Sequence, residues 1–136
     1  MPSSLRSVPT PYVALGVLAV AILIASVIPV PSATPQTDPT GSVATTTLFH
    51  IAGYATLAAG GVWTRATRLT VNADRQRRLV AVASVVAAVA LFGVVTEVLQ
   101  GFIPWRTFSV AEIGLNAASA VVGGLLATMW FYRPVE

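Results

Sequence analysis

The sequence predicts an all-α membrane protein: a bundle of four transmembrane helices, with a short interfacial or re-entrant segment between the third and fourth. Composition is the first reason, because 55% of the residues are hydrophobic and only 10% are charged, whereas a soluble domain carries about 25% charged residues. The second reason is the presence of four apolar runs, each close to the ~20 residues that cross a bilayer. The runs lack the alternating polarity of a membrane barrel, and we expect them to form a single domain over residues 1–136.

The first predicted helix covers residues 12–28 and contains no charged residue. A signal peptide is the alternative, but the apolar stretch is longer than the ~7–15 residues of such a signal, and Pro31-Ser32-Ala33 is a poor cleavage site. The segment 29–42 holds four prolines among small polar residues, which predicts an extended linker that cannot be helical. The second helix is predicted over 43–64.

The third helix is predicted over residues 79–100, and Gly101 and Pro104 should end it. The residues that follow are too apolar for a free aqueous loop, so we expect this segment to dip into the membrane interface, with Trp105 at the level of the head groups. The irregular backbone would need support from protein or a water-filled cavity at that depth.

The fourth helix is predicted over residues 110–132. Ser109 and Glu112 have the spacing of a capping box at its start. In such a box the serine hydroxyl accepts from a first-turn amide, and the glutamate reaches back to the serine N–H. Both residues therefore have a purely structural interpretation that remains open.

Arginines predict the orientation, since the chain has eight of them and no lysine. The connection between the second and third helices is rich in arginine, and the segment 29–42 has none, which places the arginine-rich side in the cytoplasm. Arg6 and Arg133 agree, so we expect a multi-pass protein of the cell membrane with both termini cytoplasmic. The net charge of +3 then reflects topology and not nucleic-acid binding. The arginines of this connection are Arg65, Arg68, Arg75, Arg77 and Arg78.

Polar residues gather at the opposite, outer side in this orientation. Ionisable groups inside a membrane are costly and usually face a protein interior or a wet cavity, so the group is the first candidate for a functional site. Spacings of three or four place His50 with Tyr54, Glu97 with Gln100, and Glu112 with Asn116 on shared helix faces. The candidate set is His50, Glu97, Gln100, Arg106, Ser109, Glu112 and Asn116.

Arg106 is the exception to the arginine bias, because it lies on the outer side. It is either an anchor that reaches the interface, a partner of Glu97 in a structural ion pair, or a cation held for a bound anion.

The arrangement of these residues resembles the VanZ-like family of small membrane proteins. The resemblance rests on Phe49-His50-xxx-Tyr54 and on the pattern Thr96-Glu97-xx-Gln100-xxx-Pro104-x-Arg106-xx-Ser109-xx-Glu112-xxx-Asn116, followed by Gly123-Gly124. This chain departs from the family at Glu112, where aspartate is usual, and lacks the lysine often found before the histidine. The resemblance implies a link to cell-envelope biology and glycopeptide (teicoplanin-type) resistance, with no settled reaction.

Three function classes stay open on the residues alone. In a binding protein, Arg106 would engage a phosphate or carboxylate of a membrane lipid or lipid-linked envelope precursor. Gln100, Ser109 and Asn116 would add hydrogen bonds, while Glu97 and Glu112 orient the arginine. In an enzyme, His50 with Glu97 or Glu112 would perform acid/base chemistry on a lipid-linked substrate. The third class is a small structural or accessory subunit, in which Gly60-Gly61 and Gly123-Gly124 serve an oligomer interface or internal packing.

Several other classes are disfavoured by what the sequence lacks. There is no cysteine, and one histidine with scattered acids does not make a metal-ligand motif, so no metal or cofactor is expected. No nucleophile elbow or phosphate-binding glycine loop occurs, which argues against ordinary hydrolases and NTPases.

Overall fold

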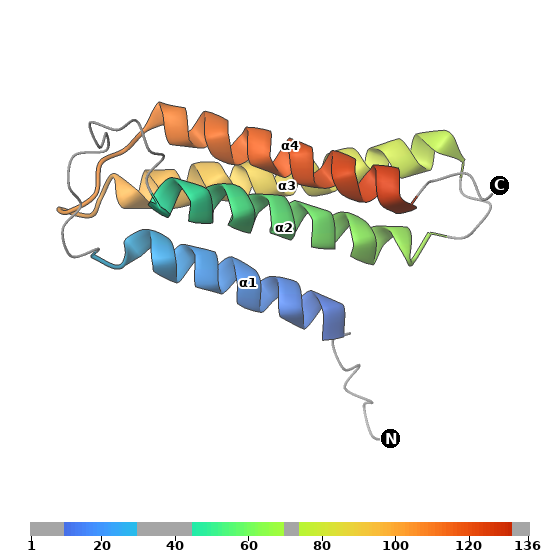
Figure 1. Ribbon diagram of the computed structural model, residues 1–136, viewed down its shortest axis with the longest axis horizontal. Helices are drawn as coiled ribbons and strands as arrows, with labels where there is room; N and C mark the ends of the chain where they lie inside the picture. Colours follow the sequence, from blue (N-terminus) through green and yellow to red (C-terminus); the bar gives the residue numbers. More distant parts are fainter. Residues whose placement is uncertain (1–9, 30–44, 70–73, 132–136) are drawn as a thin grey trace, which may run out of the picture.

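The computed structural model describes residues 10–29, 45–69 and 74–131, and over these ranges it holds four helices and no strand. They are α1 (Thr10–Val27), α2 (Thr45–Ala66), α3 (Arg75–Gln100) and α4 (Val110–Phe131). The all-α fold class is therefore confirmed. The helices run alternately up and down one long axis (Figure 1).

The two ends of the bundle differ in the residues that they hold. We call "polar end" the end where α1 and α3 finish and α2 and α4 begin, since it holds His50, Glu97 and Glu112; the "arginine end" is the opposite one (Figure 1). Residues 30–44 hold most of the proline linker and lie outside the described ranges. Arg6 and Arg133 also lie outside the described ranges. The predicted cytoplasmic placement of the two termini therefore concerns residues that the structure does not describe.

Helix α2 is the central helix of the bundle. It contacts each of the other three and packs most extensively against α4, whereas α1 lies to one side and touches only α2 and, more lightly, α3 (Figure 1). A small apolar core lies between α2, α3 and α4, and α1 covers it with partly buried side chains. The buried core residues are Tyr54, Leu57, Ala58, Val89 and Ala120.

Glycines allow α2 and α4 to approach closely. A Cβ at Gly123 would lie 2.7 Å from the Cα of Ala55, which belongs to the α2 backbone and cannot move aside. At Gly60, Gly61 and Gly124 a Cβ would instead meet side chains of neighbouring helices. The two glycine pairs thus serve internal packing within this chain, as small residues do where membrane helices cross.

The start of α3 differs from the prediction, because the helix begins at Arg75 and not at residue 79. Asp74 is its N-cap and accepts a hydrogen bond of 2.7 Å from the Arg77 N–H. The apolar pattern begins one turn later than the helix does, so a prediction based on hydrophobicity misses a capped polar turn. Arg75, Arg77 and Arg78 consequently lie on a helix and not in a loop.

Three of the helices, α1, α3 and α4, are long and apolar enough to cross a membrane. Helix α2 is 22 residues long, but its threonines, its glycines and His50 lower its hydropathy. Its central position explains the difference, since a helix surrounded by others needs less apolar surface than one facing lipid. The chain is therefore a multi-pass membrane protein by the length and composition of its helices.

The described surface is covered with large apolar side chains. They occur on all four helices, and continuous exposed apolar surface of this kind marks a face that meets lipid or another protein. Examples with more than half of their area exposed are Val17, Phe49, Leu91, Leu126 and Met129.

Candidate functional site

Helix α2 contributes His50 and Tyr54 to the polar end, with their rings 6.1 Å apart in an edge arrangement. Tyr54 is fully buried, and its hydroxyl lies 2.6 Å from the Thr96 hydroxyl of α3. Thr96 in turn donates to the Gly93 carbonyl at 2.8 Å. Because a threonine has one hydroxyl proton, Tyr54 is the donor in the first bond. This chain of bonds fixes α2 against α3 directly beneath the site.

Gly93 makes room for that contact. A Cβ at this position would lie 3.3 Å from Cε1 of Tyr54 and 3.0 Å from Cβ of Asn116. The absence of a side chain at Gly93 thus lets Tyr54 of α2 and Asn116 of α4 approach α3. Three helices therefore converge at this level of the bundle.

Glu97 lies at the centre of the site and is completely buried. Its Oε1 accepts a 2.7 Å hydrogen bond from the backbone N–H of Ser109, immediately before α4. The capping-box prediction is thus half right. The Ser109 hydroxyl does accept from the Glu112 N–H at 3.3 Å, but the carboxylate on the Ser109 N–H comes from α3 and not from Glu112.

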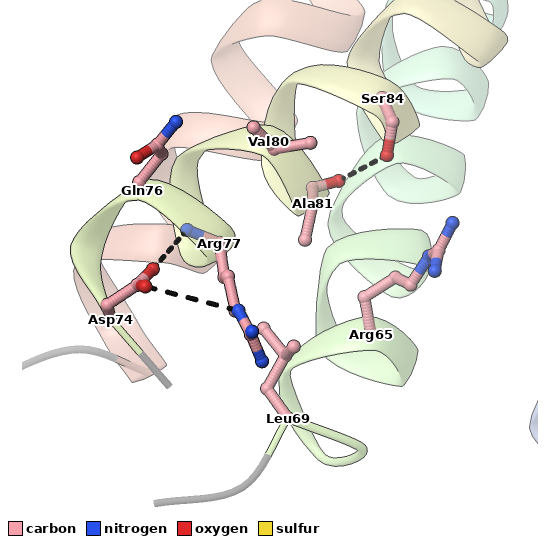
Figure 2. A pocket seen from close by; sticks show the side chains of 8 residues that line it. All are labelled: Arg65, Leu69, Asp74, Gln76, Arg77, Val80, Ala81 and Ser84. Carbon is pink, nitrogen blue, oxygen red and sulfur yellow. Dashed lines mark hydrogen bonds and ion pairs between the residues drawn. The ribbon is translucent and has the colours of Figure 1, made fainter. Parts of the chain in front are cut away.

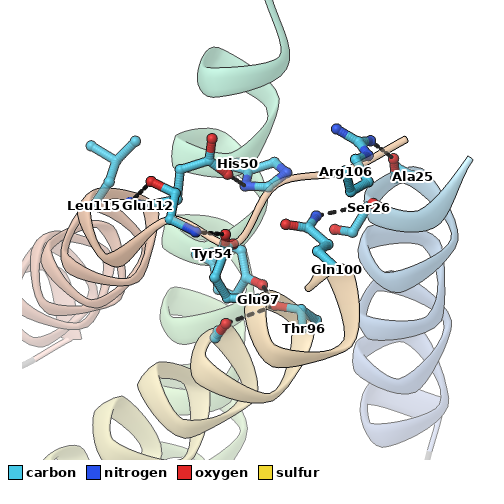
Figure 3. A network of polar contacts seen from close by, with 12 residues as sticks. Ala25, Ser26, His50, Tyr54, Thr96, Glu97, Gln100, Arg106, Glu112 and Leu115 are labelled. Atoms are coloured by element: carbon cyan, nitrogen blue, oxygen red, sulfur yellow. Dashed lines mark hydrogen bonds and ion pairs between the residues drawn. The ribbon is translucent and has the colours of Figure 1, made fainter. Parts of the chain in front are cut away.

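Glu112 is consequently directed elsewhere. Its Oε2 lies 3.9 Å from Nδ1 of His50, and the two side chains point toward one another (Figure 3). The His50 side chain is 13% exposed and that of Glu112 is 30% exposed, so this pair forms the accessible part of the site. At this distance the two groups are neighbours but do not form a direct hydrogen bond.

Asn116 lies one turn below Glu112 and is almost wholly buried, with 1% of its surface exposed. Among the described residues, no hydrogen bond of good geometry reaches Oδ1 or Nδ2 of Asn116, Oε2 of Glu97 or Nε of Arg106. The Asn116 amide does lie beside the His50 imidazole and interacts with it. Buried polar atoms are nearly always paired. Leaving one unpaired costs about 1–3 kcal/mol. Four such atoms at one end of a small bundle could therefore still form hydrogen bonds, for example to a bound molecule.

The last turn of α1 accepts hydrogen bonds from the last residue of α3 and from the segment that follows it. Gln100 Nε2 donates to the Ser26 carbonyl at 3.0 Å, and the Trp105 indole donates to the Val27 carbonyl at 3.2 Å. The final carbonyls of a helix have no partner within the helix. These bonds therefore cap α1 and add to its contacts with α2 and α3.

Arg106 takes part in the same cap. Its Nη2 lies 3.2 Å from the Ala25 carbonyl and 3.4 Å from the Ile28 carbonyl (Figure 3). A cation at a helix C-terminus also interacts favourably with the helix dipole. The expected Glu97–Arg106 ion pair is not among the ion pairs of the described residues. Arg106 contacts backbone oxygens of α1, a contact that no spacing within the sequence predicts.

The predicted residues thus divide into two adjoining groups. His50, Glu97, Ser109 and Glu112 are linked to one another across α2, α3 and α4, and Asn116 lies beside them. Gln100 and Arg106 face α1 instead. Sequence reasoning missed Ser26, which is fully buried and whose carbonyl receives Gln100. Its only signal was a single polar residue in the last turn of an apolar helix.

The site offers hydrogen-bonding and acid/base groups and no evident metal site. Over the described ranges, no three His, Asp or Glu side chains gather closely enough to hold a metal ion. The charged groups are two carboxylates and one guanidinium, with the imidazole beside them (Figure 3). Such a set can bind a group that both donates and accepts hydrogen bonds, or move a proton between His50 and Glu112.

Comparison with protein-family models, with curated proteins and with solved structures finds no match to this chain. The VanZ-like resemblance accordingly stays a prediction from the motif residues.

Proposed function

We propose that this chain is a four-pass, VanZ-like protein of the cell membrane whose polar end binds the head group of an anionic lipid or of a lipid-linked envelope precursor. In this proposal α2 crosses the membrane with the three more apolar helices, because it lies among them and runs parallel to their axis (Figure 1). The arginine end faces the cytoplasm, as the arginine bias favours, and the polar end faces outward.

The observation that carries the proposal is the set of buried polar atoms without partners. The Asn116 amide, Glu97 Oε2 and Arg106 Nε supply donors and acceptors that make no well-formed hydrogen bond to a described residue, the Asn116 amide lying beside the His50 imidazole. A purely structural network would satisfy its own members, because an unpaired group costs more than a paired one contributes. A ligand that pairs with these atoms recovers that cost on binding.

Arg106 provides the positive charge for the anionic part of the ligand. The Ala25 and Ile28 carbonyls hold one of its terminal nitrogens, which orients the guanidinium, while Nε is buried without a partner among the described residues. An oriented guanidinium binds phosphate or carboxylate with charge-assisted hydrogen bonds. Its role as a cap for α1 and its proposed role in binding are compatible, since they use different nitrogens.

The two carboxylates narrow the choice of ligand. Glu97 Oε2 and the Glu112 carboxylate accept hydrogen bonds, so a head group with hydroxyl or amide donors fits better than a bare anion. Envelope precursors joined to lipids carry sugar hydroxyls and peptide amides beside their phosphates. This composition matches the mixture of donors and acceptors at the polar end.

Exposed aromatic residues next to the site favour a lipid-borne ligand. Phe102 is 82% exposed and Trp105 is 59% exposed, both in the segment between α3 and α4. Aromatic side chains at this position are typical of the membrane–water interface. The site would then lie at the depth of the lipid head groups, and the segment would be the interfacial element that the sequence predicts.

An enzyme acting on the same class of ligand is the second candidate. The 3.9 Å separation of His50 Nδ1 and Glu112 Oε2 favours it, because acid/base catalysis needs such a pair within reach of the substrate. Arg106 would stabilise a developing anion. This candidate predicts a chemically altered head group that appears with the wild type and not with His50→Ala. A role as an accessory subunit has less support, since the glycine pairs are used inside the chain.

Replacing Asn116 by Ala tests the binding proposal. We expect the full chain, purified in mild detergent, to retain a polar lipid that mass spectrometry identifies, and Asn116→Ala to lower its occupancy about tenfold, because bound hydrogen bonds are lost. Ser119→Ala is the matched control, since Ser119 lies on the same face of α4 but its hydroxyl is already paired with the Leu115 carbonyl.

Equal lipid occupancy in wild type and Asn116→Ala would reject the proposal. The same variants in living cells address the envelope link. If the chain raises tolerance of a teicoplanin-type glycopeptide, Asn116→Ala should abolish that effect while Ser119→Ala retains it.

A further inference from the structure

A cavity of about 620 Å³ lies at the arginine end, far along the bundle from the polar site. It is formed where the last turn of α2 and the residues after it meet the first turns of α3 (Figure 2). It is lined by Arg65, Leu69, Asp74, Gln76, Arg77, Val80, Ala81 and Ser84.

The lining divides into a charged part and an apolar part. Arg65 and Arg77 come from different helices and both line the cavity, against a single carboxylate from Asp74. Both side chains are exposed, and their guanidinium groups point in different directions, so each must turn to reach a shared anion (Figure 2). Leu69, Val80 and Ala81 form the apolar part (Figure 2). An excess of positive charge beside an apolar wall matches a ligand that is anionic at one end and hydrocarbon at the other.

The one carboxylate does not neutralise the cavity. Asp74 Oδ2 lies 4.0 Å from Nε of Arg77, and the two side chains are 65% and 77% exposed. An exposed pair at that distance is weak. Both terminal nitrogens of Arg77 lie beyond this contact, so the arginine can turn to a stronger anion without losing much.

We propose that this cavity binds the phosphate of an anionic membrane lipid, with Arg65 and Arg77 as its ligands. Basic pockets at the ends of transmembrane helices are suited to such head groups. The acyl chains would continue along Val80, which is 62% exposed and starts the apolar face of α3. The proposal is independent of the function assigned to the polar end, because no residue is shared.

The location at the helix ends favours a lipid over a dissolved phosphate. The cavity extends over the first turns of the apolar stretch of α3, one of the three helices apolar enough to cross a membrane. The membrane holds lipid phosphates at high local concentration beside the two arginines, and the acyl chains can contact the apolar wall. A dissolved phosphate has no acyl chain, so the apolar wall adds nothing to its binding free energy. Gln76 and Ser84 add neutral hydrogen-bonding groups.

Titration of phosphatidylglycerol into the full chain in zwitterionic detergent tests the proposal, with bound lipid counted by native mass spectrometry. We expect Arg65→Gln and Arg77→Gln each to weaken binding about fivefold, the effect of one basic residue near an anionic lipid. Arg77→Gln keeps the backbone N–H that Asp74 caps. Arg75→Gln removes the same charge from the same turn but lies outside the cavity lining, and should leave the affinity unchanged.

A change at Asp74 should act in the opposite direction. Asn is an equally good N-cap, so Asp74→Asn keeps the start of α3 and removes the competing carboxylate; we expect tighter binding of phosphatidylglycerol. Wild-type affinity in both Arg65→Gln and Arg77→Gln, or an equal loss in Arg75→Gln, would overturn the proposal. Equally tight binding of glycerol phosphate, which has no acyl chains, would overturn the assignment to a lipid.

Discussion

Gly123→Ala should destabilise the protein by about 3 kcal/mol, because overpacking of a tight helix contact commonly costs about 1–3 kcal/mol and here no side chain can yield. The added Cβ would lie 2.7 Å from the Cα of Ala55. Accommodating it requires α2 and α4 to separate, and this is the most extensive helix contact in the bundle. The measurement is the free energy of unfolding in mixed detergent micelles.

Gly114→Ala provides the matched control for this substitution. Gly114 lies on the same helix, and a Cβ there would have no heavy atom within 4 Å. Alanine is a better helix former than glycine by up to about 1 kcal/mol, so Gly114→Ala should be neutral or stabilising. Equal stability of the two variants would mean that α2 and α4 do not approach as closely as described.

Asn116→Ala should have the opposite sign and stabilise the ligand-free protein by about 1 kcal/mol. The Asn116 amide is 1% exposed, and neither of its polar atoms makes a well-formed hydrogen bond to a described residue. Removing a buried unpaired polar group recovers about 1–3 kcal/mol. The small space left by the shorter side chain offsets part of this gain.

Ser119→Ala is the control for this stability effect, because it also shortens a buried polar side chain on α4. Ser119 is also buried, but its hydroxyl donates to the Leu115 carbonyl at 2.7 Å. Removing a paired hydroxyl brings no comparable gain, so its unfolding free energy should stay close to that of the wild type. Destabilisation by Asn116→Ala would show that the amide is paired in the folded protein and not free to bind a ligand.

Asn116→Ala is expected to raise the stability of the ligand-free protein and to lower its retention of lipid, and both effects have the same cause: the amide serves ligand binding and not folding. A residue retained for folding should not lower the stability of the fold. Functional groups often carry such a cost, because the site is organised for the ligand and not for itself. Asn116 therefore distinguishes a binding site from a structural network more sharply than Glu97, which also holds the start of α4.

The helices could be predicted from the sequence because long apolar runs determine them directly. Their ends were harder, since they depend on local caps: Asp74 extends α3 by one polar turn before its apolar stretch begins. The all-helical architecture followed from the same pattern. The lower hydropathy of α2 became understandable only when its central position was known.

The polar end could be predicted only in part. Spacing along each helix and the alternating direction of the helices placed His50, Glu97 and Glu112 at one end, where the structure has them. Pairings between helices could not be deduced, because they depend on helix rotation. Glu97 replaces Glu112 on the Ser109 N–H, and Arg106 caps α1.

Cross-linking of cysteine pairs in membranes tests most directly whether polar residues from separate helices meet at one end. The chain contains no cysteine, so His50→Cys with Glu112→Cys introduces the only two thiols. We expect a short bifunctional maleimide to link this pair efficiently, and to leave His50→Cys with Thr128→Cys unlinked, because residue 128 lies near the far end of α4. Failure of the 50–112 pair to link, or equal linking of the 50–128 pair, would contradict the convergence on which the proposed binding site depends.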